Sequence, residues 1–141
     1  MTQRLSVVIP AFNEEQGIGP LLDRLITTGN RIQELFPVIA DVEVIVVDDG
    51  STDATRTIVA RFPHVKLIRH AANKGYGAAL KTGFSNATGD YMAFLDADAT
   101  NPPEALPDLV RPIVEGRADV VVGTRVSDKD GGMPKIRTLG N

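Results

Sequence analysis

Two aspartates separated by one residue, Asp96 and Asp98, are the side chains of this sequence best suited to chemistry. They follow a short apolar run that is typical of a buried strand. If that strand stays extended, both carboxylates leave the same face about 6 Å apart and repel each other by about 3 kcal/mol. Mg²⁺ or Mn²⁺ would offset this repulsion, because both ions prefer oxygen ligands. The alternative is that one aspartate caps the following helix and the other is simply solvated. The acidic residues at the ends of neighbouring strands favour a metal site instead.

Other polar residues follow the remaining strand-like runs. After the second run, residues 51–53 can cap the next helix, which leaves Asp48 or Asp49 to bind a nucleobase imide or a ribose hydroxyl. Phe12 follows the first run and is either a stacking face for a base or a core aromatic. Arg125 follows the fifth run and suits bidentate phosphate binding or an ion pair with the aspartates.

Three weaker signals surround these residues. The Gly-rich segment 73–79 opens a helix and can approach a diphosphate, although packing of Gly77 against the sheet is an equal alternative. Residues 14–15 are both Glu and precede a helix, where they interact favourably with its dipole. His64 and His70 have no second histidine at ligand spacing, so we expect both at the surface or at the sheet edge.

Strand-like and helix-like segments alternate along the chain and must position these residues. The expected strands are Leu5–Pro10, Val42–Asp48, Val65–Arg69, Tyr91–Asp96 and Ala118–Gly123, and the expected helices are 15–35, 52–62, 75–87 and 103–115. This alternation predicts an α/β fold with a mainly parallel central sheet and helices on both faces. Ligands of such sheets bind beyond the carboxyl ends of the strands, where the polar residues gather.

Composition excludes several classes of protein. The chain has 141 residues, no cysteine and a formal charge of −3, which argues against disulfides, thiolate metal sites and a nucleic-acid partner. No apolar run approaches the roughly 20 residues that span a bilayer. We expect a soluble, intracellular chain.

Taken together, these segments resemble the family 2 glycosyltransferases of GT-A fold, particularly the branch that makes polyprenyl-phosphate sugars such as dolichyl-phosphate mannose. The matching stretches are 7–14, 46–53, 73–77, 87–91, 96–98 and 123–125. The resemblance implies a Rossmann-like nucleotide-sugar-binding domain over residues 1–125 and inverting, metal-dependent sugar transfer. The donor is a nucleoside-diphosphate sugar, GDP- or UDP-linked, and the acceptor is a polyprenyl phosphate.

The resemblance and the Gly-rich segment together also assign site residues. Nucleotide-sugar contacts are expected from Pro10, Phe12, Glu14, Val47, Asp49, Lys74, Gly75, Asp96, Ala97, Asp98 and Arg125. Asp96 and Asp98 would hold the diphosphate through Mg²⁺ or Mn²⁺, with Asp98 the direct metal ligand and Arg125 facing the phosphates. The family often carries Gln two residues after the second Asp, whereas this chain has Thr100, which still offers a ligand oxygen.

The basic segment at the end of the sequence resembles the start of a further part of the family. Residues 126–141 are expected to begin an acceptor-side, membrane-facing segment, so that the portion beyond residue 141 reaches the cytoplasmic face of a membrane. The 141-residue chain by itself is expected to bind the donor without transferring sugar. Its unfinished sheet edge predicts self-association into a homo-oligomer.

Two other functions compete with this interpretation. A sugar-nucleotide pyrophosphorylase needs a Gly-rich, basic loop after the first strand, but residues 10–15 are acidic and lack glycine. A non-enzymatic receiver domain needs a lysine after the fifth strand, where residues 123–125 are Gly-Thr-Arg. No later motif supplies an aspartate base, which a phosphate acceptor does not require because its oxygen is already anionic.

Overall fold

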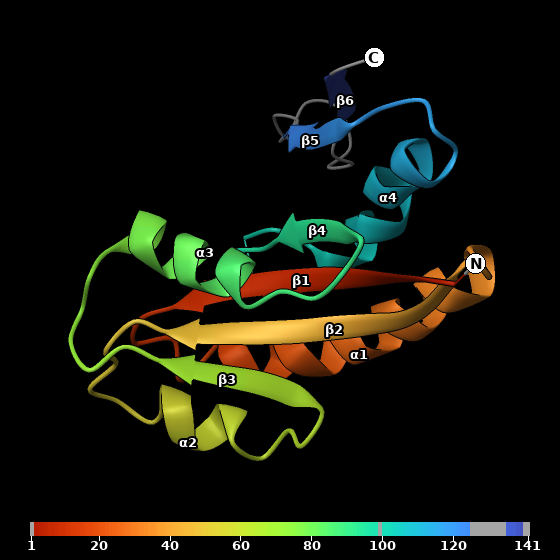
Figure 1. Cartoon of the computed structure of the whole chain (residues 1–141). Coiled ribbons are helices and arrows are strands. Elements are labelled where there is room, and N and C mark those ends of the chain that lie inside the picture. Colours follow the sequence, from red (N-terminus) through yellow and green to blue (C-terminus); the bar gives the residue numbers. More distant parts are fainter. Residues whose placement is uncertain (1, 99, 125–134, 140–141) are drawn as a thin grey trace, which may run out of the picture.

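Strands and helices alternate along the chain in the predicted order. The computed structural model describes residues 2–98, 100–124 and 135–139. Its elements are β1 (Gln3–Ala11), α1 (Ile18–Leu35), β2 (Ile39–Asp48), α2 (Thr55–Val59), β3 (Val65–Arg69), α3 (Tyr76–Ser85), β4 (Tyr91–Phe94), the 3-10 helix η1 (Pro103–Ala105), α4 (Leu106–Val114), β5 (Val120–Thr124) and β6 (Lys135–Leu139). Four parallel strands form one sheet in the order β3-β2-β1-β4. Figure 1 shows α3 on one face of this sheet and α1 and α2 on the other.

The central strands β1 and β2 are buried on both faces toward their carboxyl ends, which explains their near-continuous apolar runs. Val7 and Ile9 on β1 belong to one core cluster with the buried face of α1. Val8 belongs to a second cluster with Val47 of β2 and Ala79 of α3. Because successive side chains of a strand point to opposite faces, β1 contributes to both cores of a three-layer α/β/α arrangement. The predicted fold class is confirmed.

The fifth strand differs from expectation. β5 forms, but it pairs antiparallel with β6 in a separate two-stranded sheet, so the expectation that it extends the parallel sheet is wrong. The sequence pattern also missed β6 altogether. Within the described residues β4 pairs with β1 alone, and a groove of about 670 Å³ lies between β4, α4 and β5. Met92 and Phe94, which point to one face of β4 beside this groove, are 53% and 52% exposed, so this face of β4 is open and apolar.

Hydrogen bonds to β1 and β2 anchor the segment that precedes β4, away from the carboxyl ends of the strands. Glu43 of β2 accepts hydrogen bonds from the Ser6 hydroxyl at 2.5 Å and from the Thr88 N–H at 3.0 Å. The N–H of Gly89 donates to Ser6 Oγ at 2.8 Å. Burial opposes ionisation of Glu43, but these bonds and a nearby arginine leave its pKa below the usual value. The motif at residues 87–91 therefore fixes where β4 begins.

No helix within the described ranges is both long enough and apolar enough to cross a membrane.

Gly83, not Gly77, makes the close approach between α3 and the sheet. A Cβ built on Gly83 would overlap the side chain of Val8, whereas one on Gly77 meets nothing within 4 Å. Gly83→Ala should therefore lower the free energy of unfolding by about 1–3 kcal/mol through overpacking. Gly77→Ala, the matched control, should raise it by up to about 1 kcal/mol through helix propensity. Urea denaturation measures both; equal effects of the two substitutions would contradict the assigned packing.

Candidate functional site

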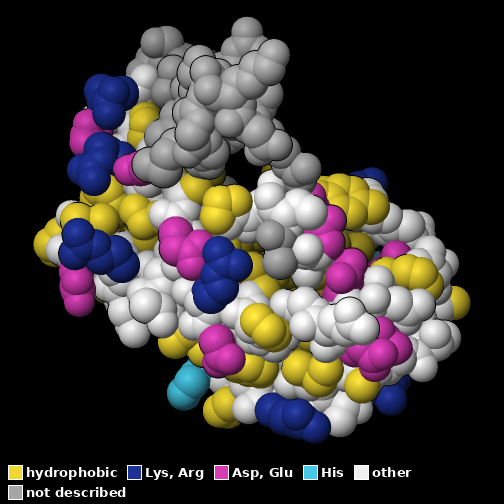
Figure 2. All heavy atoms as spheres, turned by 180° about the vertical axis from the view of Figure 1, so that it is seen from behind, with side chains coloured by type: hydrophobic (Ala, Val, Ile, Leu, Met, Phe, Trp, Pro, Cys, Tyr) yellow, Lys and Arg dark blue, Asp and Glu magenta, His cyan; other side chains and the backbone are white. Residues whose placement is uncertain are grey.

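The carboxyl ends of β2, β1 and β4 lie side by side at one edge of the sheet. The N–H of Asp49 donates to the carbonyl of Ala11 at 2.8 Å, and the N–H of Leu95 donates to the carbonyl of Val8 at 3.0 Å. Backbone bonds thus continue across the three strands at this edge. Figure 2 shows Asp and Glu side chains close together on the right-hand side, which is the side at which these strands end. The predicted gathering of acidic residues at the strand ends is therefore present.

Hydrogen bonds join the loops that follow β1 and β2. Asn13, with a positive φ of 52°, donates its N–H to Ser51 Oγ at 2.9 Å. Asn13 Oδ1 in turn accepts from the N–H of Thr52 at 2.9 Å. The N–H of Glu14 donates to Thr55 Oγ1 at 2.8 Å. These reciprocal bonds hold the two loops in one arrangement around Glu14.

Of the three residues predicted to cap α2, only Asp53 does so. Asp53 Oδ1 accepts the N–H of Thr55 at 2.9 Å, whereas Ser51 and Thr52 bond to the β1 loop instead. Glu15 Oε2 accepts the N–H of Ala54 at 3.0 Å, so Glu15 serves the start of α2 rather than the dipole of α1. The first turn of α1 contains no acidic residue.

Negative charge is concentrated around Glu14 at the carboxyl ends of the strands. Burial, followed by the charges of Asp98 and Asp53, raises the pKa of Glu14 above its usual value. Glu14 therefore lies close enough to Asp98 for the two carboxylates to repel each other. A cation bound between them would relieve this repulsion.

Asp49 has a structural duty that the sequence analysis did not assign. Its Oδ1 accepts from the N–H of Lys74 at 2.9 Å and lies 2.7 Å from Nδ1 of His70, and its Oδ2 accepts from the N–H of Gly75 at 2.9 Å. Burial raises the pKa of Asp49, but these three donors outweigh it and hold the pKa below the usual value. Asp48 is also engaged, because its Oδ1 accepts the N–H of Ser51 at 3.0 Å. The expectation that one of the two aspartates lacks a local partner is wrong.

His70 is buried, not a surface residue. Only 8% of it is exposed, and its Nε2 lies 2.8 Å from the hydroxyl of Thr82 on α3. Because the ionised Asp49 can only accept, the ring proton belongs on Nδ1. Asp49 and His70 come directly after β2 and β3, and the pairing of these two strands in the sheet brings the two side chains together.

The Gly-rich segment holds Asp49 with its backbone. Gly75 has a φ of 102° and precedes the first residue of α3. Because the N–H groups of Lys74 and Gly75 both point to Asp49, they are committed internally. The Lys74 side chain itself is exposed, so it remains accessible to a ligand.

Asp96 is held by two neutral donors from different elements. The hydroxyl of Tyr76 donates to Oδ1 at 2.6 Å, and Nδ2 of Asn101 donates to Oδ2 at 3.1 Å. Partial burial of the phenol, followed by the bond to Asp96 and the charges of Asp96 and Asp98, raises the pKa of Tyr76 to about 12. No sequence pattern pointed to Tyr76 or Asn101 as site residues. Because the charges of Asp96 and Asp98 both act on Tyr76, the two aspartates face the same region.

Asp98 lies in a turn rather than on an extended strand. β4 ends at Phe94, and a turn follows at residues 97–98, so the expected extension of the strand through Asp96 is wrong. Asp98 Oδ1 accepts from the N–H of Thr100 at 3.0 Å and from its hydroxyl at 2.6 Å. Asp98 is exposed, and Thr100 lies beside it as the sequence led us to expect.

The remaining predicted residues differ in exposure. Phe12 is 45% exposed, which excludes the alternative of a core aromatic and leaves its ring face accessible. Pro10 pairs in register with Val47, and both are buried, as is Ala97. Arg125 lies outside the described residues, and its role stays a prediction.

The carboxylates at this edge fit a divalent ion of the kind that binds with a nucleotide. Asp96 and Asp98 offer oxygen ligands, and Thr100 adds a hydroxyl. The charge of Asp98 also acts on Glu14, so a cation here would be attracted by more than one carboxylate. Among the described residues no group of three or more His, Cys, Asp or Glu side chains encloses a metal site. Two carboxylates suffice for Mg²⁺ or Mn²⁺ when phosphate oxygens and water supply the other ligands.

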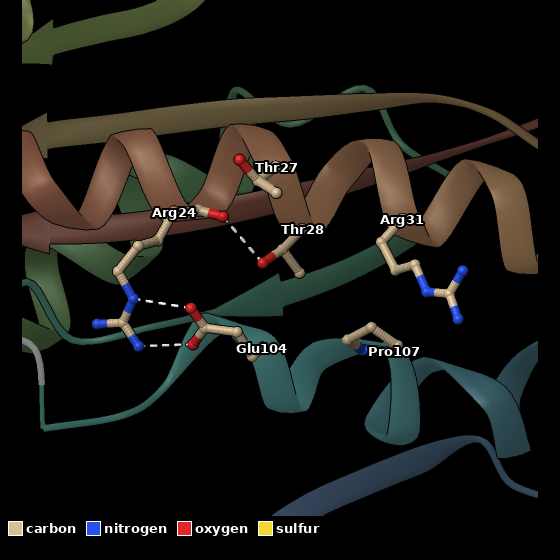
Figure 3. Close-up of a pocket in the computed structure, with 6 residues that line it drawn as sticks. All are labelled: Arg24, Thr27, Thr28, Arg31, Glu104 and Pro107. Atoms are coloured by element: carbon tan, nitrogen blue, oxygen red, sulfur yellow. Dashed lines mark hydrogen bonds and ion pairs between the residues drawn. The ribbon is translucent and has the colours of Figure 1, made fainter.

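A separate pocket of about 350 Å³ lies between α1 and the segment that contains η1 (Figure 3). Arg24 forms two bonds to Glu104 in it, at 2.8 and 2.6 Å, and Arg31 is paired with Glu34 at 3.4 Å. The close-up shows the Arg31 guanidinium well apart from the Arg24–Glu104 pair. Its arginines thus already have carboxylate partners, so this pocket is a weaker candidate than the carboxylates at the strand ends.

Comparisons with known proteins agree with this geometry. The family model of glycosyl transferase family 2 matches residues 6–140. Dolichol-phosphate mannosyltransferase of Pyrococcus furiosus is 36% identical over 86% of this chain, and undecaprenyl-phosphate 4-deoxy-4-formamido-L-arabinose transferase of Proteus mirabilis is 38% identical over 86%. The chain spans only 33% and 36% of these two relatives.

Among solved structures, a mannosyltransferase from Pyrobaculum calidifontis in complex with GDP-Man and Mn²⁺ superimposes with a TM-score of 0.71. It is 28% identical, and the match covers 92% of this chain and 37% of that one. Neighbours of this kind establish the GT-A fold that the resemblance implied. With a family model that matches almost its whole length, this chain belongs to glycosyl transferase family 2.

Proposed function

We propose that this chain is the donor-binding part of a metal-dependent glycosyltransferase. It would move a sugar from a GDP- or UDP-linked donor to a polyprenyl phosphate, with inversion at the anomeric carbon. The observation that carries the proposal is that residues 74–76 bond to Asp49 after β2 and to Asp96 after β4, while the charge of Asp98 acts on Glu14 after β1. The named activities of the two curated relatives support the polyprenyl-phosphate acceptor.

The nucleoside would lie across the ends of β1 and β2. The half-exposed ring of Phe12 offers a face on which the base stacks. Asp49 is 3% exposed and uses three of about four acceptor positions internally, so its Oδ2 has one acceptor position left for a donor from the nucleoside. The bond from His70 would thus orient the Asp49 carboxylate toward the nucleoside as well as support the fold.

The diphosphate would lie over the end of β4. Asp98 and Asp96 would hold Mg²⁺ or Mn²⁺ there, with Thr100 beside them and Arg125 on the acceptor side. The bound ion supplies positive charge that stabilises the departing diphosphate. An anionic oxygen of the acceptor forms the new bond to the anomeric carbon, while the bond to the diphosphate breaks and its electron pair leaves with the nucleoside diphosphate. No residue needs to remove a proton from an acceptor oxygen that is already anionic.

Location and assembly belong to the same proposal. A polyprenyl-phosphate acceptor would place the reaction at a membrane surface, on its cytoplasmic side. The division into a donor domain at 1–125 and an acceptor-side segment from 126 onwards is part of this proposal. Self-association through the open edge of β4 also stays a prediction.

Replacing Phe12 tests where the base lies. Phe12→Ala should weaken binding of GDP or UDP by about 5- to 150-fold, because base–aromatic stacking contributes about 1–3 kcal/mol. Ile26→Ala, at a residue on α1 with a similar 43% exposure, should leave binding unchanged. Calorimetric titration of each variant measures the effect. Unchanged affinity in Phe12→Ala would remove the base from this position.

Calorimetry also tests the proposed function as a whole. The 141-residue chain should bind either GDP or UDP, and the sugar-linked form of the same nucleotide, more tightly with Mn²⁺ than without it. The 141-residue chain should not pass labelled sugar to a polyprenyl phosphate by itself, because it spans only 33% and 36% of the two curated relatives. If the chain binds neither GDP nor UDP with Mg²⁺ or with Mn²⁺, the proposal is overturned. Labelling of the chain by acetyl phosphate would favour a receiver domain instead.

A further inference from the structure

One short segment contacts both acidic ends of the site. The backbone N–H groups of Lys74 and Gly75 bind Asp49 after β2, and the next side chain, that of Tyr76, binds Asp96 after β4. β2 and β4 are not neighbours, because β1 lies between them in the sheet. The segment 74–76 therefore crosses the carboxyl ends of the strands from β2 to β4. It connects the proposed nucleoside side of the site to the proposed metal side.

The contact between Tyr76 and Asp96 is specific in geometry. The hydroxyl lies 2.6 Å from Oδ1, although 52% of the tyrosine is exposed and little packing holds the ring from outside. Asn101 donates to the other oxygen, Oδ2, at 3.1 Å. With one donor on each oxygen, the plane of the carboxylate is fixed, yet each oxygen keeps a further acceptor position.

We propose that Tyr76 is a positioning residue for Asp96, which it holds together with Asn101 in the orientation that receives a metal-bound diphosphate. This inference rests on the proposed function and assigns a role to two residues outside the predicted site. Partners that orient a metal ligand typically change metal affinity by 10- to 100-fold when removed, without contacting the ion. The arrangement of Tyr76 and Asn101 around Asp96 is of this kind.

A purely structural role makes a different prediction. If the hydroxyl only secured the start of α3, its loss would lower the midpoint of thermal unfolding and leave the metal dependence of binding intact. If it orients Asp96, its loss should act on the metal-dependent part of binding. Tyr76→Phe separates the two roles, because it removes one oxygen and leaves the exposed ring in place.

The experiment is a calorimetric titration with GDP and with UDP, in the presence and absence of Mn²⁺, on the 141-residue chain. Tyr76→Phe should lower the Mn²⁺-dependent affinity by about 10- to 100-fold, while metal-free affinity and thermal unfolding change little. Asn101→Ala should act in the same direction, and the double variant should lose less than the product of the two separate losses. Non-additivity is expected because both residues act on one carboxylate.

Tyr91→Phe is the matched control. Tyr91 also donates its hydroxyl to a side-chain oxygen, Gln3 Oε1 at 2.7 Å, but it lies at the start of β4, away from the strand ends. It should bind nucleotide like the wild type. If Tyr76→Phe and Asn101→Ala keep the wild-type response to Mn²⁺, the positioning role is wrong although the proposed function stands. If the wild type itself binds neither nucleotide with Mn²⁺, the proposed function fails and the inference fails with it.

Discussion

Asp98→Asn should reduce the Mn²⁺-dependent affinity for a nucleoside diphosphate by at least about 100-fold, because loss of a direct charged ligand exceeds the usual cost of losing an outer partner. The amide keeps the size of the side chain and one oxygen but removes the negative charge. Asp98 is exposed, so the fold should tolerate the change. Calorimetry with and without Mn²⁺ measures the loss, and metal-free binding should stay near the wild-type value.

Asp108→Asn is the control for this substitution. Asp108 is an exposed aspartate in the first turn of α4 and takes no part in the candidate site. It should bind nucleotide as the wild type does. An Asp98→Asn variant that matched this control would show that the divalent ion, if it binds at all, is held elsewhere.

Asp49→Ala should lower the free energy of unfolding at pH 7 by roughly 3–5 kcal/mol, because it leaves His70 and two backbone N–H groups without their buried acceptor. Asp41→Ala, which breaks an exposed ion pair with Arg4, should cost about 1 kcal/mol or less. Urea denaturation compares the two. Similar losses in both variants would contradict the structural role given to Asp49.

The same comparison has a pH dependence with a defined sign. Because the folded-state pKa of Asp49 is lowered, its ionisation stabilises the fold above the unfolded pKa of about 3.9. That contribution is lost as the pH falls through the folded-state pKa. The difference between wild type and Asp49→Ala should therefore shrink as the pH is lowered from about 5 to below about 3. A difference that grew with acidification would mean that the fold raises the pKa of Asp49 instead of lowering it.

The parallel sheet was predictable because its local signals agree with its tertiary environment. The runs around Val7 and Val46 are rich in branched apolar residues, as burial of these two central strands on both faces requires. β5 shows the limit of this reasoning. Its residues 120–122 have the same composition, yet composition does not specify a partner, and β5 pairs with β6 rather than with β4.

The acidic character of the site was predictable, but its supporting contacts were not. Asp96 and Asp98 stand out because they directly follow an apolar run. Tyr76 and His70 lie 20 and 21 residues from the aspartates that they contact, so no spacing rule links them. The expected capping of α2 by Ser51 failed for a similar reason, since the Ser51 hydroxyl accepts the N–H of Asn13 from another loop.

The most direct test of the account is the position of the ion. A crystal grown with Mn²⁺ and the nucleotide that binds more tightly should show an anomalous manganese peak between a carboxylate oxygen of Asp98 and the diphosphate, in direct contact with both. The base should lie against Phe12 in the same crystal. Bound nucleotide with no manganese beside Asp98, or with manganese at another site, would contradict the central claim.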